Sequence, residues 1–297
     1  MPKMVKSLVC GDEFMNEKKK KKRILIIVIA VFGVICLCSI GYLVGKELGI
    51  FKTGKTYEEV RESYAPNLTI GTTVDNEEQN ENLRTSYAPN LTKPSNSVTA
   101  PPVDNEVDFD GLRAQNPDVY AWIYIPDTNV SLPVLQSTED DNFYLDHDVY
   151  KNYSFPGAIY SQSMNKKDFS DRVTLLYGHN MLNGSMFATL YSFDNQEFFD
   201  SHKYIYIYTP DRRLTYEVVC AHEYDDRHIL NSFNFNDNSV FSDWLSSMKN
   251  PHSVYSHVRQ DVDLDLNSKV LVLSTCTNSG DGRFLVQGVL VSDEKTK

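Results

Sequence analysis

The sequence predicts a mainly β fold, a largely antiparallel barrel or sandwich, behind one apolar segment, and three observations support this. Eight short runs rich in β-branched and aromatic residues lie between residues 121 and 291, with turn-forming residues between them. Between residues 108 and 291 only two stretches, one that begins near residue 108 and one at 238–250, show a helical pattern. Residues 24–45 form 22 consecutive positions without a charged side chain. Many short strands with few helices favour a barrel or sandwich over an α/β fold.

The N-terminal part has the pattern of a membrane anchor. Residues 1–23 end in the basic run Lys18–Arg23, and residues 24–45 are long enough to cross a hydrocarbon core of about 30 Å as a helix. The positive-inside rule then predicts a short cytoplasmic N-terminus, a single-pass transmembrane signal anchor over 24–45 and an extracellular remainder. The alternative is a cleaved secretory signal, but its apolar region is usually only about 7 to 15 residues long.

Charge and cysteine usage exclude several classes of protein. Beyond residue 46 the chain has 20 basic and 37 acidic residues, which argues against binding to nucleic acid or to anionic lipid. Of the five cysteines, only Cys220 and Cys276 lie beyond the apolar segment, too few for a disulfide-stabilised scaffold. They form either one disulfide or two free thiols, and we predict free thiols.

Residues 46–107 are predicted to form a flexible extracytoplasmic stalk. The heptapeptide SYAPNLT occurs at Ser63–Thr69 and again at Ser86–Thr92, within sequence that is poor in large apolar residues. Such a segment does not bury enough apolar area to offset its ordering entropy, and a stalk of this length would span on the order of 40 Å. Two copies are too few for a solenoid. A ligand motif is the alternative interpretation of the repeat.

The elements of the domain predicted over residues 108–297 follow in order. Asp108 caps a short helix, and a turn at Asn116–Asp118 leads into the first strand. Residues 238–250 carry Val240, Phe241, Trp244, Leu245 and Met248 at helical spacing, which indicates a helix packed on the sheet. The eight strands are predicted at 121–125, 131–136, 157–162, 172–178, 203–210, 213–224, 269–276 and 283–291.

The last two strands carry a candidate catalytic pair. Cys276 ends one apolar run and Arg283 begins the next, and the loop between them contains two glycines. If the strands form a hairpin, the two side chains lie opposite each other, with Cβ atoms roughly 4.5 to 5.5 Å apart. A guanidinium beside a thiol lowers the pKa of the thiol and can stabilise an oxyanion. The alternative is that Cys276 is a packing residue and Arg283 faces solvent.

A cysteine nucleophile usually needs a histidine to protonate the leaving amine, and His179 is the candidate. It follows an apolar strand and a glycine, which places its imidazole at a strand end. Cys220 and His222 alternate onto one face of another strand and form a rival pair, although no loop or arginine adjoins them. Residues 222–228 offer histidines and carboxylates without the spacing of a metal site, so we expect no metal and no other cofactor.

The region from about 109 to 291, which contains these candidate residues, resembles the class B sortases. These are membrane-anchored cysteine transpeptidases of Gram-positive bacteria. The resemblance rests on NPDVYAWIYIPDTNVSLPVLQ, FYLDHDVYKNYSFPGAIY, DFSDRVTLLYGHNMLNGSMFATL and LSTCTNSGDGRF. It implies an eight-stranded β-barrel with N-terminal helices and a helix between late strands. By the same resemblance Cys276, His179 and Arg283 match the catalytic trio. The loop before Arg283 is shorter than the family pattern suggests, and the stalk is an addition.

The resemblance also implies a reaction. Cys276 would cleave a C-terminal sorting signal of the Asn-Pro-x-Thr-x or x-Pro-x-Thr-Gly kind after its threonine and transfer the surface protein to a peptidoglycan amine. Asn180, Ser274, Thr275 and Thr277 are placed to line the substrate groove, although local turn or strand-end hydrogen bonds account for them equally well. The expected partners are sorting-signal proteins, the peptidoglycan precursor and the membrane. Two alternatives are a tethered cysteine peptidase that only hydrolyses and a non-catalytic surface receptor.

Overall fold

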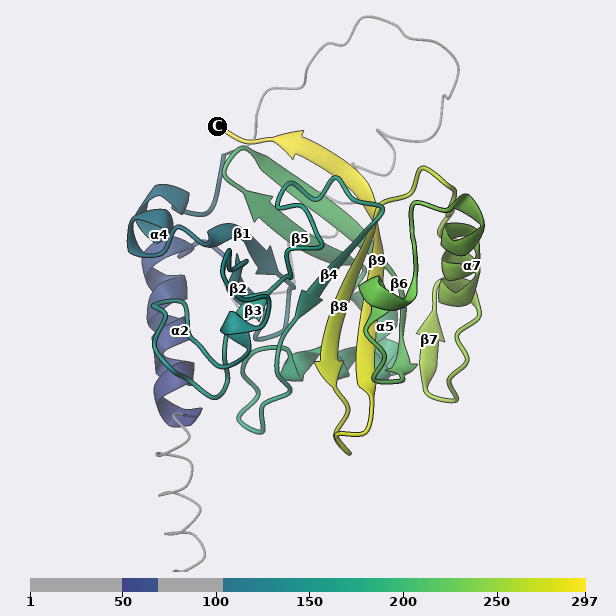
Figure 1. Cartoon of the computed structure of the whole chain (residues 1–297), viewed down its shortest axis with the longest axis horizontal. Helices are drawn as coiled ribbons and strands as arrows, with labels where there is room; N and C mark the ends of the chain where they lie inside the picture. The colour runs from purple at the N-terminus through teal and green to yellow at the C-terminus, as the bar shows by residue number, and fades with distance from the viewer. Residues whose placement is uncertain (1–49, 69–103) are drawn as a thin grey trace, which may run out of the picture. The chain divides into compact units, whose positions relative to one another are not determined.

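The computed structural model describes residues 50–68 and 104–297, which form a β-barrel with helices around it (Figure 1). Two helices come first, α2 and α4, and the remaining helices and short 3-10 turns lie between strands. In chain order the elements are α2 Ile50–Tyr64, α4 Phe109–Gln115, β1 Val119–Tyr124, β2 Ser131–Leu135, η1 Phe143–Leu145, β3 Ile159–Tyr160, β4 Val173–Tyr177, η2 Ala188–Asp194, α5 Gln196–Ser201, β5 Tyr204–Thr209, β6 Arg212–Tyr224, α6 Ile229–Ser232, α7 Asn238–Lys249, β7 Ser256–Val258, β8 Val270–Cys276 and β9 Arg283–Lys295.

The sheet closes into a barrel of eight strands. Its order is β5-β1-β2-β3-β4-β8-β9-β6-β7, and an additional pairing of β5 with β6 joins the two sides. This pairing leaves β7 outside the ring, attached to the free edge of part of β6. The pairs β2–β3 and β4–β8 are parallel and the other pairs are antiparallel. The predicted mainly β fold and the eight-stranded barrel implied by the resemblance are therefore confirmed.

Each of the eight predicted strands is present, and their apolar character has a plain structural reason. The side chains of β1 and β2 are buried at every position, and those of β8 are buried at every position before Cys276. A strand covered on both faces needs apolar residues in succession, which is the pattern that the sequence shows. The sequence analysis missed β7, because its three residues are only half-buried and include a serine and a histidine.

Helix α7 confirms the predicted helix at 238–250. The side chain of Asp237 caps it by accepting hydrogen bonds from the amides of Ser239 and Val240. Its buried residues belong to one cluster with side chains of β4, β6, β8 and β9, so the helix covers the face of the sheet that these strands share. Four of the five residues predicted to face the sheet are fully buried: Phe241, Trp244, Leu245 and Met248.

Helix α2 corrects the predicted stalk over part of its length. Residues 46–107 were expected to be flexible throughout, whereas Ile50–Tyr64 is helical and the chain stays in contact with the barrel as far as Leu68. The helix has a polar sequence, but its residues Tyr57 and Val60 and the following Ala65 are buried. The Tyr57 hydroxyl donates a hydrogen bond to the Gly157 carbonyl. A few well-placed side chains thus offset the polar composition. At the other end of the stalk, Asn105 donates to the carbonyls of Thr209 and Pro210.

The predicted cytoplasmic segment 1–23, the predicted transmembrane span 24–45 and residues 46–49 and 69–103 of the predicted stalk lie outside the described residues. Among the helices of the described part, none combines the length and apolar character needed to cross a membrane.

A buried histidine joins the two longest strands, β6 and β9. His222 is only 5% exposed, its Nδ1 donates to the Glu223 carbonyl, and its Nε2 accepts a hydrogen bond of 2.8 Å from the Gln287 amide. The bond from Gln287 requires a neutral ring, because a protonated Nε2 cannot accept a hydrogen bond. Burial lowers the pKa of His222, and the hydrogen bond to Glu223 only partly offsets this effect.

This histidine makes the stability depend on pH. Because the pKa of folded His222 is lowered, the unfolded chain takes up a proton first as the pH falls below about 6.5. We expect the free energy of unfolding to decrease between about pH 7.5 and pH 5.5, and His222→Gln to weaken that decrease. Urea unfolding at each pH measures it, with the exposed His252→Gln as the matched control. An equal pH dependence in both variants would contradict the assignment.

Candidate active site

The β8–β9 hairpin places Cys276 directly opposite Arg283. The two residues form the last pair of the ladder, which begins at Val270 and Val289. The Arg283 Nη1 atom lies 3.6 Å from the Cys276 Sγ atom, and both side chains are half-buried. Cys276 and Cys220 are both free thiols, as predicted. The cation therefore faces the sulfur in a partly desolvated position, where its charge acts more strongly than in water.

The loop that joins the two strands is held by its own hydrogen bonds. The Thr277 amide donates to the Gly282 carbonyl over 3.0 Å, and the Gly282 amide donates to the Thr277 hydroxyl over 3.1 Å. A Cβ atom at Gly282 would lie 2.7 Å from the Tyr224 carbonyl oxygen, so only glycine fits there. The loop thus keeps the ends of β8 and β9 in register.

The neighbouring strand β4 brings His179 to the same edge of the barrel. It runs parallel to β8 with Tyr177 level with Ser274, so His179 and Cys276 are each two residues beyond this pair. Adjacent strands lie about 4.8 Å apart. Gly178 lies between Tyr177 and His179 in the chain. A Cβ atom on it would come within 2.5 Å of the Ile159 side chain and 2.8 Å of the Phe187 ring. The glycine therefore lets the side chains of Ile159 and Phe187 pack closely against the end of β4.

The surroundings of His179 favour a neutral imidazole with a defined proton position. Its Nε2 atom donates to the Leu145 carbonyl over 2.9 Å, and its ring stacks on Phe155 with the centroids 5.7 Å apart. Burial lowers the pKa of His179, while the Leu145 carbonyl and the charge of Asp146 offset part of this effect. Because Nε2 already carries a hydrogen that bonds to Leu145, Nδ1 is the nitrogen left to exchange a proton.

The four residues predicted to line the substrate groove differ in burial and in the hydrogen bonds that they make. Asn180 donates from its side chain to the Cys276 carbonyl over 3.2 Å and to Asn278, so it ties the end of β4 to the end of β8. Ser274 and Thr275 are buried, and strand alternation turns Thr275 to the face opposite Cys276. Thr277 supports the loop. Any contact of these residues with a substrate stays a prediction.

Three tyrosines near the pair were not identified from the sequence. Tyr177 and Tyr160 stack with their centroids 5.4 Å apart, and the charge of Arg283 acts on both. Burial raises the pKa of Tyr177 to about 12, although Arg283 partly offsets it. The Tyr191 hydroxyl donates to the Cys276 carbonyl over 3.5 Å. Tyr177 could have been identified from the alternation of side chains along a strand, because it ends β4 and lies two residues before His179.

The Tyr177 hydroxyl is buried and has no hydrogen-bond partner among the residues that the structure describes. An unpaired buried hydroxyl costs roughly 1 to 3 kcal/mol. Such a group, on which the charge of Arg283 acts, is a candidate donor to a bound peptide.

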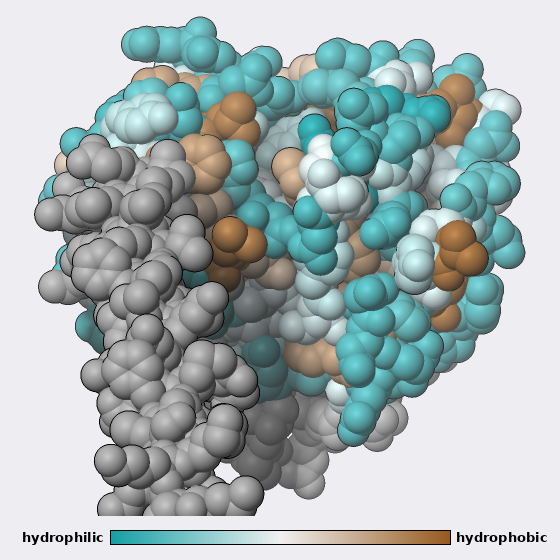
Figure 2. All heavy atoms as spheres, turned by 90° about the horizontal axis from the view of Figure 1, so that it is seen from below, coloured by the Kyte–Doolittle hydropathy of each residue, from teal (hydrophilic) through white to brown (hydrophobic). Residues whose placement is uncertain are grey.

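The surface around His179 combines polar and apolar groups. Figure 2 shows the end of the molecule at which β8 ends, where hydrophobic side chains form separate groups on a mainly hydrophilic surface. Leu145 and Phe155, both of which contact His179, are 44% and 40% exposed, and Leu182 is fully exposed. These side chains offer apolar contact to a peptide beside the imidazole.

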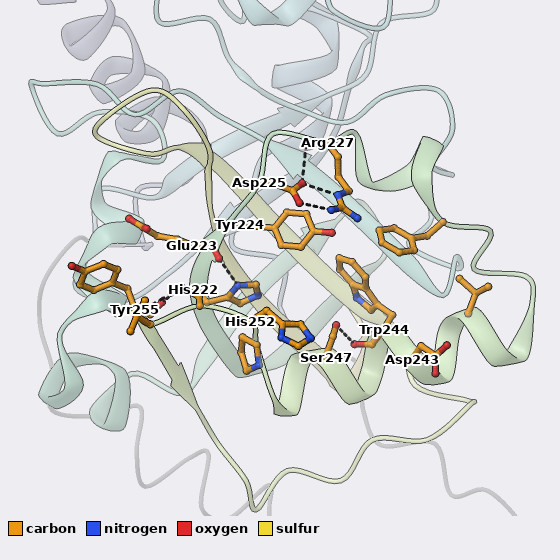
Figure 3. Close-up of a pocket in the computed structure, with 15 residues that line it drawn as sticks. His222, Glu223, Tyr224, Asp225, Arg227, Asp243, Trp244, Ser247, His252 and Tyr255 are labelled. Atoms are coloured by element: carbon orange, nitrogen blue, oxygen red, sulfur yellow. Dashed lines mark hydrogen bonds and ion pairs between the residues drawn. The ribbon is translucent and has the colours of Figure 1, made fainter.

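The rival pair Cys220 and His222 does not have the geometry of a nucleophile and its base. Cys220 is fully buried, and burial raises the pKa of its thiol well above the usual value. Both nitrogens of His222 are engaged by Glu223 and Gln287. His222 also lines a pocket of about 720 Å³ beside α7 (Figure 3), where Tyr224 and Trp244 lie among the lining residues. Cys276, His179 and Arg283 do not line this pocket.

The comparisons with known proteins agree with this geometry. The sortase domain family matches residues 123–291, more than half of the chain. Sortase B of Listeria monocytogenes is 30% identical over 184 residues, which cover 61% of this chain and 73% of that protein.

Solved structures extend the likeness to the fold. The structure of Clostridium perfringens sortase B is 29% identical, with a TM-score of 0.57, and the match covers 62% of this chain and 100% of that one. A Streptococcus pyogenes class B sortase involved in pilus biogenesis is 30% identical, with a TM-score of 0.54, 62% of this chain and 98% of that one being covered. The chain therefore belongs to the sortase family, among the class B sortases, and this membership implies a cysteine transpeptidase for cell-wall anchoring.

Proposed function

We propose that this protein is a membrane-anchored transpeptidase that cleaves a C-terminal sorting signal after its threonine and joins the new carboxyl end to a peptidoglycan amine. The signal is of the Asn-Pro-x-Thr-x or x-Pro-x-Thr-Gly kind. Residues 24–45 anchor the enzyme in the cell membrane, with the barrel on the extracellular side. The partners are sorting-signal proteins and the lipid-linked precursor of the cell wall.

The observation that supports this proposal most strongly is the distance of 3.6 Å between Arg283 Nη1 and Cys276 Sγ. In the first step the Cys276 thiolate attacks the threonine carbonyl, and the electron pair of the C=O bond moves to the oxygen. The Arg283 guanidinium stabilises this oxyanion as it forms. Collapse of the intermediate breaks the C–N bond and leaves a thioester on Cys276.

His179 supplies the proton that the departing amine needs. Its Nε2 is held by the Leu145 carbonyl, so the proton is transferred from Nδ1 of the imidazolium. In the second step the incoming amine attacks the thioester carbonyl and loses a proton to the same nitrogen. The C–S bond then breaks, which forms the new amide and releases Cys276 as the thiolate. Because burial lowers the pKa of His179, the imidazolium gives up its proton readily. One histidine thus acts as an acid in one step and as a base in the next.

Replacement of Cys276 and replacement of Arg283 are expected to lower the activity to different extents. Cys276→Ala is expected to abolish cleavage of sorting-signal peptides, because it removes the thiol that lies 3.6 Å from Arg283 Nη1. Arg283→Lys is expected to lower kcat by about 100-fold or more with a smaller change in KM, since it weakens oxyanion stabilisation. Mass spectrometry of the products measures both, and Cys220→Ala is the matched control. Cleavage that survives in Cys276→Ala would overturn the assignment.

The hydroxyl of Tyr177 is expected to donate a hydrogen bond to the bound peptide. Tyr177→Phe should lower kcat/KM by about tenfold, the loss of one hydrogen bond, while the free energy of unfolding stays equal or rises. The reason is that this hydroxyl lacks a partner within the described chain. Kinetics and urea unfolding of the same variant separate the two effects. Unchanged kinetics together with lower stability would show a purely structural role.

A transpeptidase differs from a hydrolase in how its acyl-enzyme partitions. Adding an oligoglycine or a diaminopimelate-type amine is expected to change the product from free acid to conjugate, because amine and water compete for one thioester. The ratio of the two products by mass spectrometry measures this partition. If only free acid formed at every amine concentration, the enzyme would be a tethered peptidase, and if no signal were cleaved, a non-catalytic receptor would be favoured.

A further inference from the structure

The first copy of the SYAPNLT repeat is bound to the barrel. It begins in the last turn of α2, and the buried residues of this region are Tyr57, Val60, Ala65 and Leu68. Ala65 is completely buried and Leu68 is 5% exposed. The Tyr64 carbonyl accepts a hydrogen bond of 2.8 Å from the Asp108 amide. The copy is therefore held by apolar side chains and by its own backbone.

The barrel side of this contact is formed by α4, β2 and the chain before β3. A Cβ atom at Gly111 would come within 2.8 Å of the Tyr64 ring, so the ring lies directly on this glycine. The Gly157 carbonyl accepts from the Tyr57 hydroxyl, and the Ser131 hydroxyl lies 3.5 Å from the Leu68 carbonyl. We call this surface, formed by Asp108, Gly111, Ser131 and Gly157, the repeat-binding surface.

The second copy carries almost the same set of contact residues 23 positions later. Residues 86–92 repeat 63–69 without a change, and the likeness continues upstream, with Leu83 at the place of Val60 and Arg84 at the place of Arg61. Ala88 and Leu91 thus match the buried Ala65 and Leu68. Of the four buried positions, Val60 is replaced by another apolar residue, Leu83, and only Tyr57 is replaced by a polar one, Asn80.

We propose that the repeat-binding surface takes either copy, so that residues 83–91 of the same chain compete with residues 60–68 for one site. The first copy is the preferred occupant because it alone supplies the Tyr57 ring and its hydrogen bond. The second copy takes the site when the first leaves it. Exposed residues of the first copy, such as Ser63, Pro66 and Asn67, are repeated as well, so the second copy contains the same residues that form the turn of the first.

The length of the chain permits this exchange. With the first copy bound, 43 residues separate Tyr64 from Asp108, and with the second copy bound, 20 residues separate Tyr87 from Asp108. Twenty residues reach about 66 Å when extended, far more than a closed loop needs. The shorter connection raises the effective concentration of the second copy by about threefold, which offsets part of the loss of the Tyr57 contact.

The exchange would move 23 residues from one side of the bound copy to the other. With the second copy bound, these 23 residues are added to the connection between the barrel and the chain that precedes residue 50. A flexible chain of 23 residues spans about 26 Å. If residues 24–45 anchor the protein as proposed above, the greatest distance between the active site and the membrane then depends on which copy is bound. The competition between the copies does not itself depend on that anchor.

Hydrogen exchange of the full-length chain tests the competition. Leu68→Asp places a carboxylate at a buried position of the first copy and should release it. We expect exchange of the amides in 83–91 to slow by at least about tenfold in this variant, because the second copy becomes bound. The Asp108 amide should stay protected, since the Tyr87 carbonyl replaces that of Tyr64 as its acceptor.

The double variant Leu68→Asp with Leu91→Asp is the matched control. In it, both the amides of 83–91 and the Asp108 amide should exchange fast. Amides of β8 serve as the internal reference for an intact barrel. Fast exchange of 83–91 in Leu68→Asp, with the Asp108 amide unprotected as in the double variant, would overturn the proposal. So would protection of 83–91 that rises with protein concentration, because the second copy would then bind a neighbouring molecule.

Discussion

The parallel pairing of β4 with β8 is the constraint on which the rest of the site depends. It sets Tyr177 level with Ser274, and the residues two positions further on, His179 and Cys276, then reach the same edge of the barrel. The antiparallel pairing of β8 with β9 adds Arg283 opposite Cys276. A shift of either register by one residue would turn a reacting side chain to the other face. The chemistry is thus positioned by backbone hydrogen bonds rather than by contacts between the reacting groups.

The same strands account for the stability of that arrangement. Each apolar side chain that β8 buries contributes about 1.5 to 3 kcal/mol, and α7 covers the face that leads to Cys276. Burial also acts on the reacting groups, since it lowers the pKa of His179 and raises that of Tyr177. Cys220, deep in the same cluster, is packed as a small hydrophobe. One core therefore keeps one thiol unreactive and holds the other at its edge.

Much of the fold was predictable because long apolar strands and a capped amphipathic helix carry strong local signals. The strand at 269–276 and α7 are examples. Helix α2 was not, because its contact with the barrel depends on a few side chains in a polar sequence, and local composition does not show which distant surface receives them. Cys276 and Arg283 were predictable as neighbours across a hairpin, and strand alternation alone places Thr275 on the face opposite Cys276, whereas no local pattern shows that His179 donates to Leu145.

The account's central claim is that Cys276 carries the substrate as a thioester between the two steps of transfer. The most direct measurement is the intact mass of the protein, quenched in acid soon after mixing with a sorting-signal peptide in the absence of an amine. The account predicts an added mass equal to the peptide portion up to threonine, mapped to Cys276, which disappears when an amine is added. Turnover of the peptide without such an adduct, or an adduct on another residue, would contradict it.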